Sequence, residues 1–417
     1  MSPAPLAVAM IGSGEYTTGY TTGSVKSDKK IGVVGLSLFD LRRRGIVGNL
    51  SIAGTSDKWG AIREHFAKNI EGVYKDMDCT FEPYPAVGAA RDPDAYKAAI
   101  DALPPKSAIT IFTPDSTHHA IALYAIERGH HVLVTKPATQ TLADHTDLIK
   151  AAEKHGVYVC VEMHKRFDPT YADGKQKAKL IGDFTFFSSY MSQPKTQLET
   201  FAAWAGKDSD ISYYLNSHHI DVHAWYLEGI AGNWRPTRVT ASASTGTATS
   251  LGIADGCEDS ISLLVDWESA DDLSKRGTAV YTASWTAPVG AGVHSEQHFH
   301  YMGSKGEVRV NQSRRGYNVT IDGQGNSDIN AFYMMYSPDA EGYFQGQHGY
   351  GYISIEKFVT TCQRVNAGEV KLSDLDKSMP TIKNTVLSGA ILEAGRRSLD
   401  EKRSVNIKKV GEEWTLV

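Results

Sequence analysis

The pattern of apolar and polar positions changes about two fifths of the way along the chain. In the first part, short β-branched apolar runs alternate with amphipathic stretches that end near glycine. Five runs have the pattern of strands buried on both faces: 7–11, 50–54, 108–112, 131–134 and 157–161. Three stretches have helical periodicity: 26–44, 120–128 and 142–155. This alternation predicts a parallel sheet with helices on both of its faces.

After about residue 180 the runs become longer and richer in Thr, Ser, Val and aromatic residues. The runs that predict strands are 184–191, 238–244, 260–267, 278–285 and 307–311. Polar turns separate them, which is typical of an antiparallel sheet with one face solvated or paired. Helical pattern returns at 354–365 and 379–398. We therefore predict an α/β first domain over 1–163 and an α+β second domain over 164–417, whose last helices can pack back on the first.

Composition excludes several classes of protein. The 417 residues are 41% hydrophobic and 22% charged, with a formal charge of −5, so we expect no nucleic-acid partner. No apolar stretch approaches the ~20 residues of a spanning helix. Four distant cysteines show no metal-ligand spacing, and the first residues lack a basic region. We expect a cytoplasmic protein without a disulfide scaffold, a metal site or a membrane partner.

A glycine motif follows the first predicted strand. Residues 12–17 read GSGEYT, which fits G-x-G-x-x-[G/A] except that Thr17 replaces the third small residue. Gly12 permits a tight turn, and Gly14 lets backbone amides approach a pyrophosphate. At this position the motif predicts a dinucleotide-binding Rossmann domain over 1–163, with Glu15 and Tyr16 beside the cofactor.

The end of the second predicted strand bears on the choice between NAD and NADP. An acidic residue there favours NAD, because it binds the ribose 2′-hydroxyl. Here Thr55 takes that position, followed by Ser56 and Lys58, and hydroxyls with a cation suit a 2′-phosphate. We therefore predict NADP. NAD stays possible, because a small shift in the alignment makes Asp57 the ribose ligand.

Two later strand ends carry polar groups to the edge where ligands bind in such sheets. The cofactor-side residues predicted at the first of these ends are Thr113, Pro114, Asp115 and His118. The next strand ends at Lys136 and Pro137. A lysine at the edge of a parallel sheet can reach both cofactor and substrate.

A histidine-rich segment lies early in the second part. Residues 213–225 read YYLNSHHIDVHAW, with histidines at 218, 219 and 223. No HExxH motif or nearby cysteine accompanies them, so a metal site is disfavoured. An imidazole that handles a proton beside a hydride-transfer site suits the pattern better, and a buried structural histidine is the remaining interpretation.

These motifs together resemble the Gfo/Idh/MocA oxidoreductases. The similarity covers most of the chain. Besides the glycine turn and the strand ends above, it rests on Arg166-Phe167-x-Pro169, the turn 303–307 (GSKGE), the helix 354–358 (SIEKF) and the segment around His218. The resemblance implies a Rossmann domain followed by an open, mostly antiparallel sheet, whose free face often joins copies into homo-oligomers.

The resemblance also implies catalytic groups. Lys136 corresponds to the lysine of the family's E-K-P motif, and His218 to its catalytic histidine. The family's aspartate four residues earlier is Tyr214 here, and Asn216 stands where glycine is usual. A tyrosine hydroxyl can form hydrogen bonds but carries no negative charge at neutral pH. Tyr214 is therefore a candidate partner or alternative proton donor.

Residues 12–19 and the segment before Asp221 look like those of fungal reductases of D-galacturonate or D-glucuronate. A uronate carboxylate needs a cation. Lys165 is the candidate, whereas the family role of Arg166 is structural and Arg314 and Arg315 are further possibilities. Tyr190, Asn216 and His219 are candidate contacts to sugar hydroxyls. Trp204 and Trp285 suit either a sugar face or the core, and His298 and His300 either a pocket or solvent.

The resulting hypothesis is an NAD(P)H-dependent reductase of a sugar acid, with Lys136 and His218 as its polar catalytic groups. The alternative within enzymes is a dehydrogenase of a neutral aldose or polyol such as galactose, glucose or inositol. A non-catalytic NAD(P)-binding regulator of the same fold is a further possibility, and a nicotinamide-using glycosidase a remote one.

Overall fold

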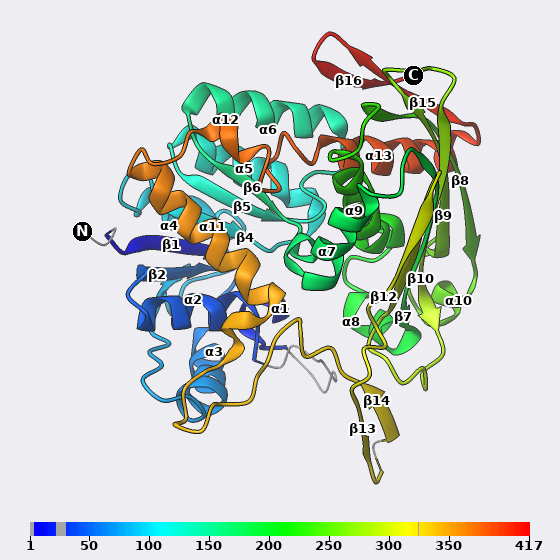
Figure 1. The fold of residues 1–417 in the computed structure, drawn as a ribbon. Helices are drawn as coiled ribbons and strands as arrows, with labels where there is room; N and C mark the ends of the chain where they lie inside the picture. Colours follow the sequence, from blue (N-terminus) through cyan, green and yellow to red (C-terminus); the bar gives the residue numbers. More distant parts are fainter. Residues whose placement is uncertain (1–3, 22–30, 324) are drawn as a thin grey trace. The chain divides into compact units, whose positions relative to one another are not determined.

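The computed structural model describes residues 4–21, 31–323 and 325–417. The chain forms two compact units (Figure 1). Unit 1 comprises Met1–Ala138, Asp147–Phe167 and Ala331–Asn384, and unit 2 comprises Thr139–Thr146, Asp168–Asn330 and Thr385–Val417. The sequence placed all of 164–417 in the second domain. The structure returns 331–384 to unit 1, because the helix in that segment packs its apolar face against the first sheet.

Unit 1 contains a parallel six-stranded sheet in the order β3-β2-β1-β4-β5-β6, the order of a Rossmann fold. Its strands are β1 (Leu6–Ile11), β2 (Val47–Ala53), β3 (Glu82–Tyr84), β4 (Ala108–Ile111), β5 (His131–Thr135) and β6 (Val159–Glu162). The five predicted strands are confirmed, and β3 is added at the edge. A three-residue strand gives too short a period to be recognised from sequence.

Helices cover both faces of this sheet, which is why its strands are apolar throughout. Val8 and Met10 of β1 face one core, and Ala9 and Ile11 the other. The helices of unit 1 are α1 (Glu15–Thr18), α2 (Val34–Arg43), α3 (Trp59–Phe66), α4 (Ala95–Asp101), α5 (His118–Glu127), α11 (Tyr350–Asn366) and α12 (Leu372–Leu375). α6 (Leu142–His155) begins in unit 2 and continues into unit 1.

The crossover helix predicted over 26–44 is α2, and residues 26–30 of that prediction lie outside the described part of the chain. The arginine triplet at its end pairs with carboxylates: Arg42 with Asp78, Arg43 with Asp40, and Arg44 with Glu356. The triplet is thus an ion-paired helix terminus.

Unit 2 contains an eight-stranded sheet in the order β12-β11-β7-β10-β9-β8-β15-β16. Its strands are β7 (Phe184–Pro194), β8 (Trp234–Thr245), β9 (Glu258–Ser269), β10 (Arg276–Ala287), β11 (Glu296–Gly303), β12 (Gly306–Asn311), β15 (Val405–Val410) and β16 (Glu413–Leu416). All neighbouring pairs are antiparallel except β7 and β10, which are parallel. A separate hairpin is formed by β13 (Asn318–Ile321) and β14 (Gly325–Asp328).

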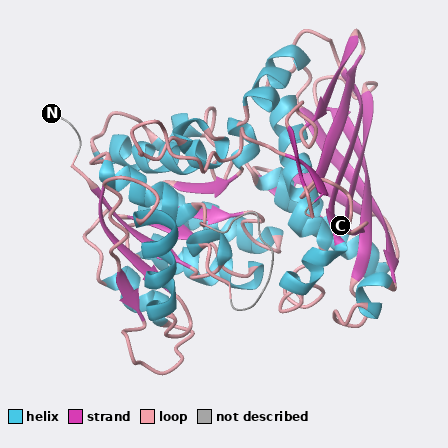
Figure 2. Ribbon diagram, turned by 90° about the horizontal axis from the view of Figure 1, so that it is seen from below, coloured by secondary structure: helices cyan, strands magenta, loops and turns pink. Residues whose placement is uncertain are grey.

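One face of this sheet is covered by helices and the other is open (Figure 2). The helices of unit 2 are α7 (Pro169–Ala178), α8 (Leu198–Phe201), α9 (Ser217–Leu227), α10 (Thr247–Ser250) and α13 (Val386–Glu401). Buried and less buried residues alternate along β9, where Leu263 is buried in the core and Leu264 is 46% exposed. This alternation is the predicted signature of a sheet with one free face.

Candidate functional site

The first strand–helix turn of unit 1 is built around two glycines with different tasks. Gly12 has φ +110°, and a Cβ on it would lie 2.1 Å from the carbonyl oxygen of Phe112. Only glycine fits there. A Cβ on the exposed Gly14 would meet no atom within 4 Å. The turn is therefore closed on its strand side and open on its outer side, as a turn that admits a pyrophosphate needs to be.

Thr17, which departs from the glycine motif, is buried. A Cβ on Gly35 of α2 would lie 2.7 Å from the backbone carbonyl oxygen of Thr17. The backbones of α1 and α2 therefore approach each other closely at this point. Glu15 and Tyr16 begin α1, and the Tyr16 ring stacks on Phe112.

Asp57, which follows β2, forms hydrogen bonds within unit 1 through both of its carboxylate oxygens. Its Oδ2 accepts a hydrogen bond from the backbone N–H of Gly88 at 2.7 Å, and its Oδ1 accepts one from Trp59 at 3.2 Å. These bonds, chiefly that from Gly88, lower the pKa of the carboxyl. Asp57 therefore shapes the loop with both oxygens. Thr55 and Lys58 are exposed beside it, and Ser56 is half-buried.

His118, which the sequence predicts on the cofactor side, is a buried side chain that joins two strand ends. Its Nδ1 lies 2.8 Å from the carbonyl oxygen of Pro137, and its Nε2 lies 2.9 Å from that of Thr113. The ring thereby joins the loop after β4 to the loop after β5, where the Lys136–Pro137 peptide is cis. Lys136 is half-buried at the end of β5. Pro114 is exposed and Asp115 half-buried in the β4 loop.

The end of β6 holds a buried carboxylate that the sequence did not single out. Glu162 is 3% exposed; its Oε1 accepts from the Ser354 hydroxyl and its Oε2 lies 2.9 Å from His164 Nδ1. The sequence signal that could have identified Glu162 is a charged residue directly after an apolar run that predicts a strand. Nearby, the hydroxyls of Tyr16 and Tyr333 form a hydrogen bond. Burial, together with the charge of Glu162, raises the pKa of Tyr16 well above its usual value.

The histidine-rich segment of unit 2 forms a π-helical turn, η5 (Ser212–Asn216), that continues into α9. His218 lies in the first turn of α9 and is 7% exposed. Tyr214 is half-buried; its ring packs on Phe201 and Trp204, and its hydroxyl accepts a 3.5 Å hydrogen bond from Gln193. Among the residues of this segment that the sequence predicts to be catalytic, we keep His218 and Tyr214 as candidates.

Three residues predicted to contact sugar hydroxyls have partners within unit 2. Asn216 is 1% exposed, and its Nδ2 donates to the Ser212 hydroxyl and to the Ile261 carbonyl. His219 is 1% exposed, and its Nε2 lies 3.1 Å from the hydroxyl of Tyr171 in the core. Both therefore stabilise the fold. Tyr190 stacks on His298 on the open face of the sheet, away from the helices.

Three further residues with more than one possible role make structural contacts: His223, Trp285 and His300. His223 is fully buried, stacks on Phe187 and bonds to the Tyr281 hydroxyl at 2.6 Å. Burial lowers its pKa well below the usual value. Trp285 is also fully buried, and its Nε1 donates to the Glu258 carbonyl. His300 pairs with Glu307 on the open face.

The cations proposed for a substrate carboxylate are mostly engaged within their own units. Arg315 pairs with the buried Asp168, Arg314 pairs with Glu296, and Arg166 donates to Asn384. Lys165 is 2% exposed. A carboxylated substrate thus finds little unused positive charge among the three arginines.

In the part of the chain that the structure describes, no cluster of His, Cys, Asp or Glu side chains has the arrangement of a metal site. Within the same residues, no helix is long and apolar enough to cross a membrane.

Fold and site together define a protein with a dinucleotide-binding Rossmann domain. Residues 6–163 match the model of the Gfo/Idh/MocA oxidoreductase family, described as an NAD-binding Rossmann fold. Residues 6–163 are therefore a domain of that family.

Curated relatives match part of the chain, and a solved structure shares its fold. The chain is 30% identical over 132 residues to scyllo-inositol 2-dehydrogenase (NAD(+)) of Bacillus subtilis, which is 29% of this chain and 38% of that protein. It is also 30% identical over 119 residues to scyllo-inositol 2-dehydrogenase (NADP(+)) IolW of the same organism, covering 27% and 32%. The chain thus matches about a third of the length of these relatives. The crystal structure of myo-inositol 2-dehydrogenase from Lactobacillus plantarum shares the fold, with a TM-score of 0.65 at 19% identity over 97% of this chain and 100% of that one.

Proposed function

We propose that the protein is an NAD(P)-dependent dehydrogenase that interconverts a secondary alcohol of a neutral cyclic polyol or aldose with the corresponding carbonyl. The observation that carries the proposal is the first turn of unit 1, closed at Gly12 and open at Gly14, within a domain of the Gfo/Idh/MocA family. The two inositol dehydrogenases among its relatives support a polyhydroxylated ring as the substrate class.

We propose NADP as the preferred cofactor. Asp57 is the only acidic residue in the loop 54–58, and both of its oxygens already bind backbone N–H groups. Thr55, Ser56 and Lys58 then supply the hydroxyls and the cation that suit a 2′-phosphate.

In this reaction the nicotinamide accepts or supplies the hydride, and the protein manages the proton and the charge on oxygen. In the oxidative direction the C–H electron pair leaves as hydride, the O–H proton passes to His218, and the carbon–oxygen double bond forms. Lys136, as an ammonium group, donates a hydrogen bond to the reacting oxygen and stabilises its developing negative charge. Tyr214 is the second candidate donor, since its hydroxyl replaces the carboxylate usual in the family.

A neutral substrate agrees better with the charges than a uronate does. Arg314 and Arg315 are paired with carboxylates, and Arg166 binds an amide of its own unit. A uronate carboxylate would have to displace one of these partners or reach the buried Lys165, and the desolvation of a paired charge is costly.

The experiment is a substrate panel followed by nicotinamide absorbance. Inositols and neutral aldoses are offered with NADP⁺ or NAD⁺, and D-galacturonate and D-glucuronate are offered with NADPH or NADH. We expect turnover with a neutral polyol or aldose, and Lys136→Met is expected to abolish it while cofactor binding stays measurable. Turnover of uronates alone would contradict a neutral polyol or aldose as the substrate and would favour a sugar acid. Cofactor binding without turnover of any compound would favour a regulator of the same fold.

A further inference from the structure

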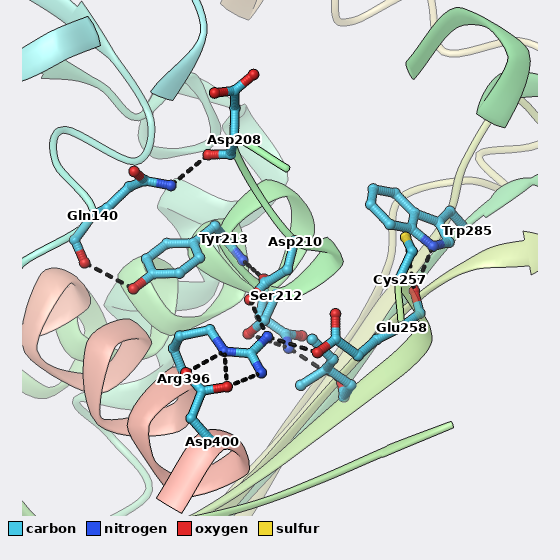
Figure 3. Close-up of polar contacts among 12 residues, drawn as sticks. Gln140, Asp208, Asp210, Ser212, Tyr213, Cys257, Glu258, Trp285, Arg396 and Asp400 are labelled. Carbon is cyan, nitrogen blue, oxygen red and sulfur yellow. Dashed lines mark hydrogen bonds and ion pairs between the residues drawn. The ribbon is translucent and has the colours of Figure 1, made fainter. Parts of the chain in front are cut away.

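One arginine joins three parts of unit 2 at the start of the η5–α9 segment (Figure 3). Arg396 extends from α13, and its Nη1 donates to Asp210 Oδ2 at 3.2 Å and to Glu258 Oε1 at 2.7 Å. Its Nη2 donates to Asp400 Oδ1 at 2.6 Å. The guanidinium thereby links α13, the first residue of β9 and the loop before η5.

Asp210 connects this guanidinium to the backbone of the helical segment. Its Oδ1 accepts a hydrogen bond from the N–H of Tyr213 at 2.8 Å, and its carbonyl accepts one from the N–H of Tyr214 at 3.0 Å. One carboxylate oxygen thus caps the segment while the other faces Arg396. Asp210 is only 6% exposed, so little solvent competes for these bonds.

The same loop is held at two further points. The Tyr213 hydroxyl donates to the carbonyl of Gln140 at 2.7 Å, and the Gln140 side chain donates to the carbonyl of Asp208. One turn later, Asn216 donates to the Ile261 carbonyl of β9. The segment therefore starts from a loop whose backbone is fixed from several directions.

We propose that Asp210 and Arg396 are positioning residues: they fix the first turn of the segment that presents Tyr214 and His218, and they do not touch the substrate. For its catalytic readout the proposal rests on the proposed dehydrogenase function. The physical reason is that a displacement of about 1 Å at a reacting group can reduce the rate about 100-fold. An ion pair two helical turns before His218 can control such a displacement without contributing to the chemistry.

Acid is expected to weaken this positioning contact. Burial raises the pKa of Asp210 to about 6, although the N–H of Tyr213 and the charge of Arg396 act in the opposite direction. The other titratable groups near it are Glu258, Cys257 and, through Arg396, Asp400. Below this pH Asp210 becomes neutral and its ion pair with Arg396 is lost, while Glu258 and Asp400 still bind the guanidinium.

The test compares Arg396→Gln with Arg397→Gln. Arg397 is the next residue of α13, and its ion pair with Glu401 has the same i,i+4 spacing as that of Arg396 with Asp400. Arg396 differs in that it also pairs with Asp210 and Glu258, whose side chains are only 7% and 14% exposed. We expect kcat of Arg396→Gln to fall about tenfold or more at an unchanged KM for the cofactor. Arg397→Gln is expected to stay within about twofold of the wild type. Arg396→Lys, which keeps the charge, is expected to recover part of the loss.

Amide hydrogen exchange provides a readout that does not depend on turnover. The N–H groups of 213–219 are expected to exchange faster in Arg396→Gln and unchanged in Arg397→Gln. Asp210→Asn, which keeps an acceptor for Tyr213 but removes the ion pair with Arg396, provides the same test where Arg396→Gln does not fold.

Wild-type kcat together with unchanged exchange in these variants would overturn the positioning role. A wild type that oxidises no polyol or aldose would instead refute the proposed function, and the exchange experiment would still decide whether the ion pair holds the segment.

Discussion

The first turn of unit 1 and the η5–α9 segment of unit 2 provide their candidate chemistry in different ways. The first turn works through the absence of side chains: Gly12 has no room for a Cβ, and Gly14 leaves space for a ligand. The η5–α9 segment provides its candidate chemistry through side chains. Most of its polar side chains, however, form hydrogen bonds that stabilise the fold. Asn216, His219 and His223 each bond to the core of unit 2. A backbone-built site is therefore specified locally, whereas a site built from side chains depends on distant partners.

The largest effect is expected from breaking the backbone-built site. Gly12→Ala puts a Cβ against the Phe112 carbonyl at a φ of +110°, so we expect a loss of about 3 kcal/mol or more in the free energy of unfolding and no cofactor binding. Urea unfolding and fluorescence titration with NADPH measure both.

Gly14→Ala is the matched control for that variant, since its Cβ meets no atom within 4 Å. It is expected to fold like the wild type and to bind NADPH about tenfold more weakly, a difference of about 1.4 kcal/mol. Equal destabilisation in both variants would contradict the division of tasks between the two glycines.

A second prediction concerns the histidines of unit 2. His223→Ala removes the bond to Tyr281 and the stack on Phe187, and we expect a loss of about 3 kcal/mol. His298→Ala, on the open face, is expected to change stability by less than about 0.5 kcal/mol. Chemical denaturation compares the two, and similar losses would argue against the proposed division between core and open face.

The cofactor loop offers a smaller, specific effect. Thr55→Asp places a carboxylate where a ribose hydroxyl is expected and repels a 2′-phosphate. The ratio of NADP to NAD affinity should fall about tenfold, as binding titrations with both cofactors measure. Asp57→Asn, whose oxygen still accepts one backbone bond, should leave this ratio nearly unchanged. A large shift in that variant instead would identify Asp57 as the ribose ligand.

The smallest effect is a pH dependence of stability. The pKa of His223 is well below its usual value in the folded state, so the unfolded chain binds a proton that the folded chain does not. The free energy of unfolding should therefore fall as the pH drops below about 6.5, by at most about 1.4 kcal/mol per pH unit from this residue. His223→Leu should flatten that slope relative to His298→Ala. Asp210 opposes it, because a raised pKa makes the folded state bind the proton more tightly as the pH falls through about 6.

Much of unit 1 was predictable because its determinants are local. Apolar runs of the right length specify strands, glycines end the helices, and GSGEYT after the first strand specifies the nucleotide turn. The sequence predicted that the last helices can pack back on the first domain, but not that the segment is 331–384, since the packing of α11 on the sheet depends on a contact between residues distant in sequence. The close approach of Gly35 to the backbone of Thr17 was hidden for the same reason.

In unit 2 the sequence identified the η5–α9 segment as a candidate site. It could not show which of the polar residues there are catalytic and which are structural. Three histidines within six residues are equivalent by composition, and only burial separates His223 in the core and His219 beside Tyr171 from His218. Tyr190 alternates correctly for a strand, but the register with β11 decides which face it occupies. The ion pair of Asp210 and Arg396 joins residues far apart in the chain, and no spacing rule predicts it.

The sequence by itself determined the parallel-sheet domain, the open sheet and the glycine turn, because periodicity and backbone freedom are properties of neighbouring residues. The tertiary structure alone decided which polar side chains stabilise the fold. The reason is that residues distant in sequence supply their hydrogen-bond partners and bury them. Asp57, His118, Asn216 and His219 form hydrogen bonds within their own units, and Lys136, His218 and Tyr214 are the groups proposed for chemistry.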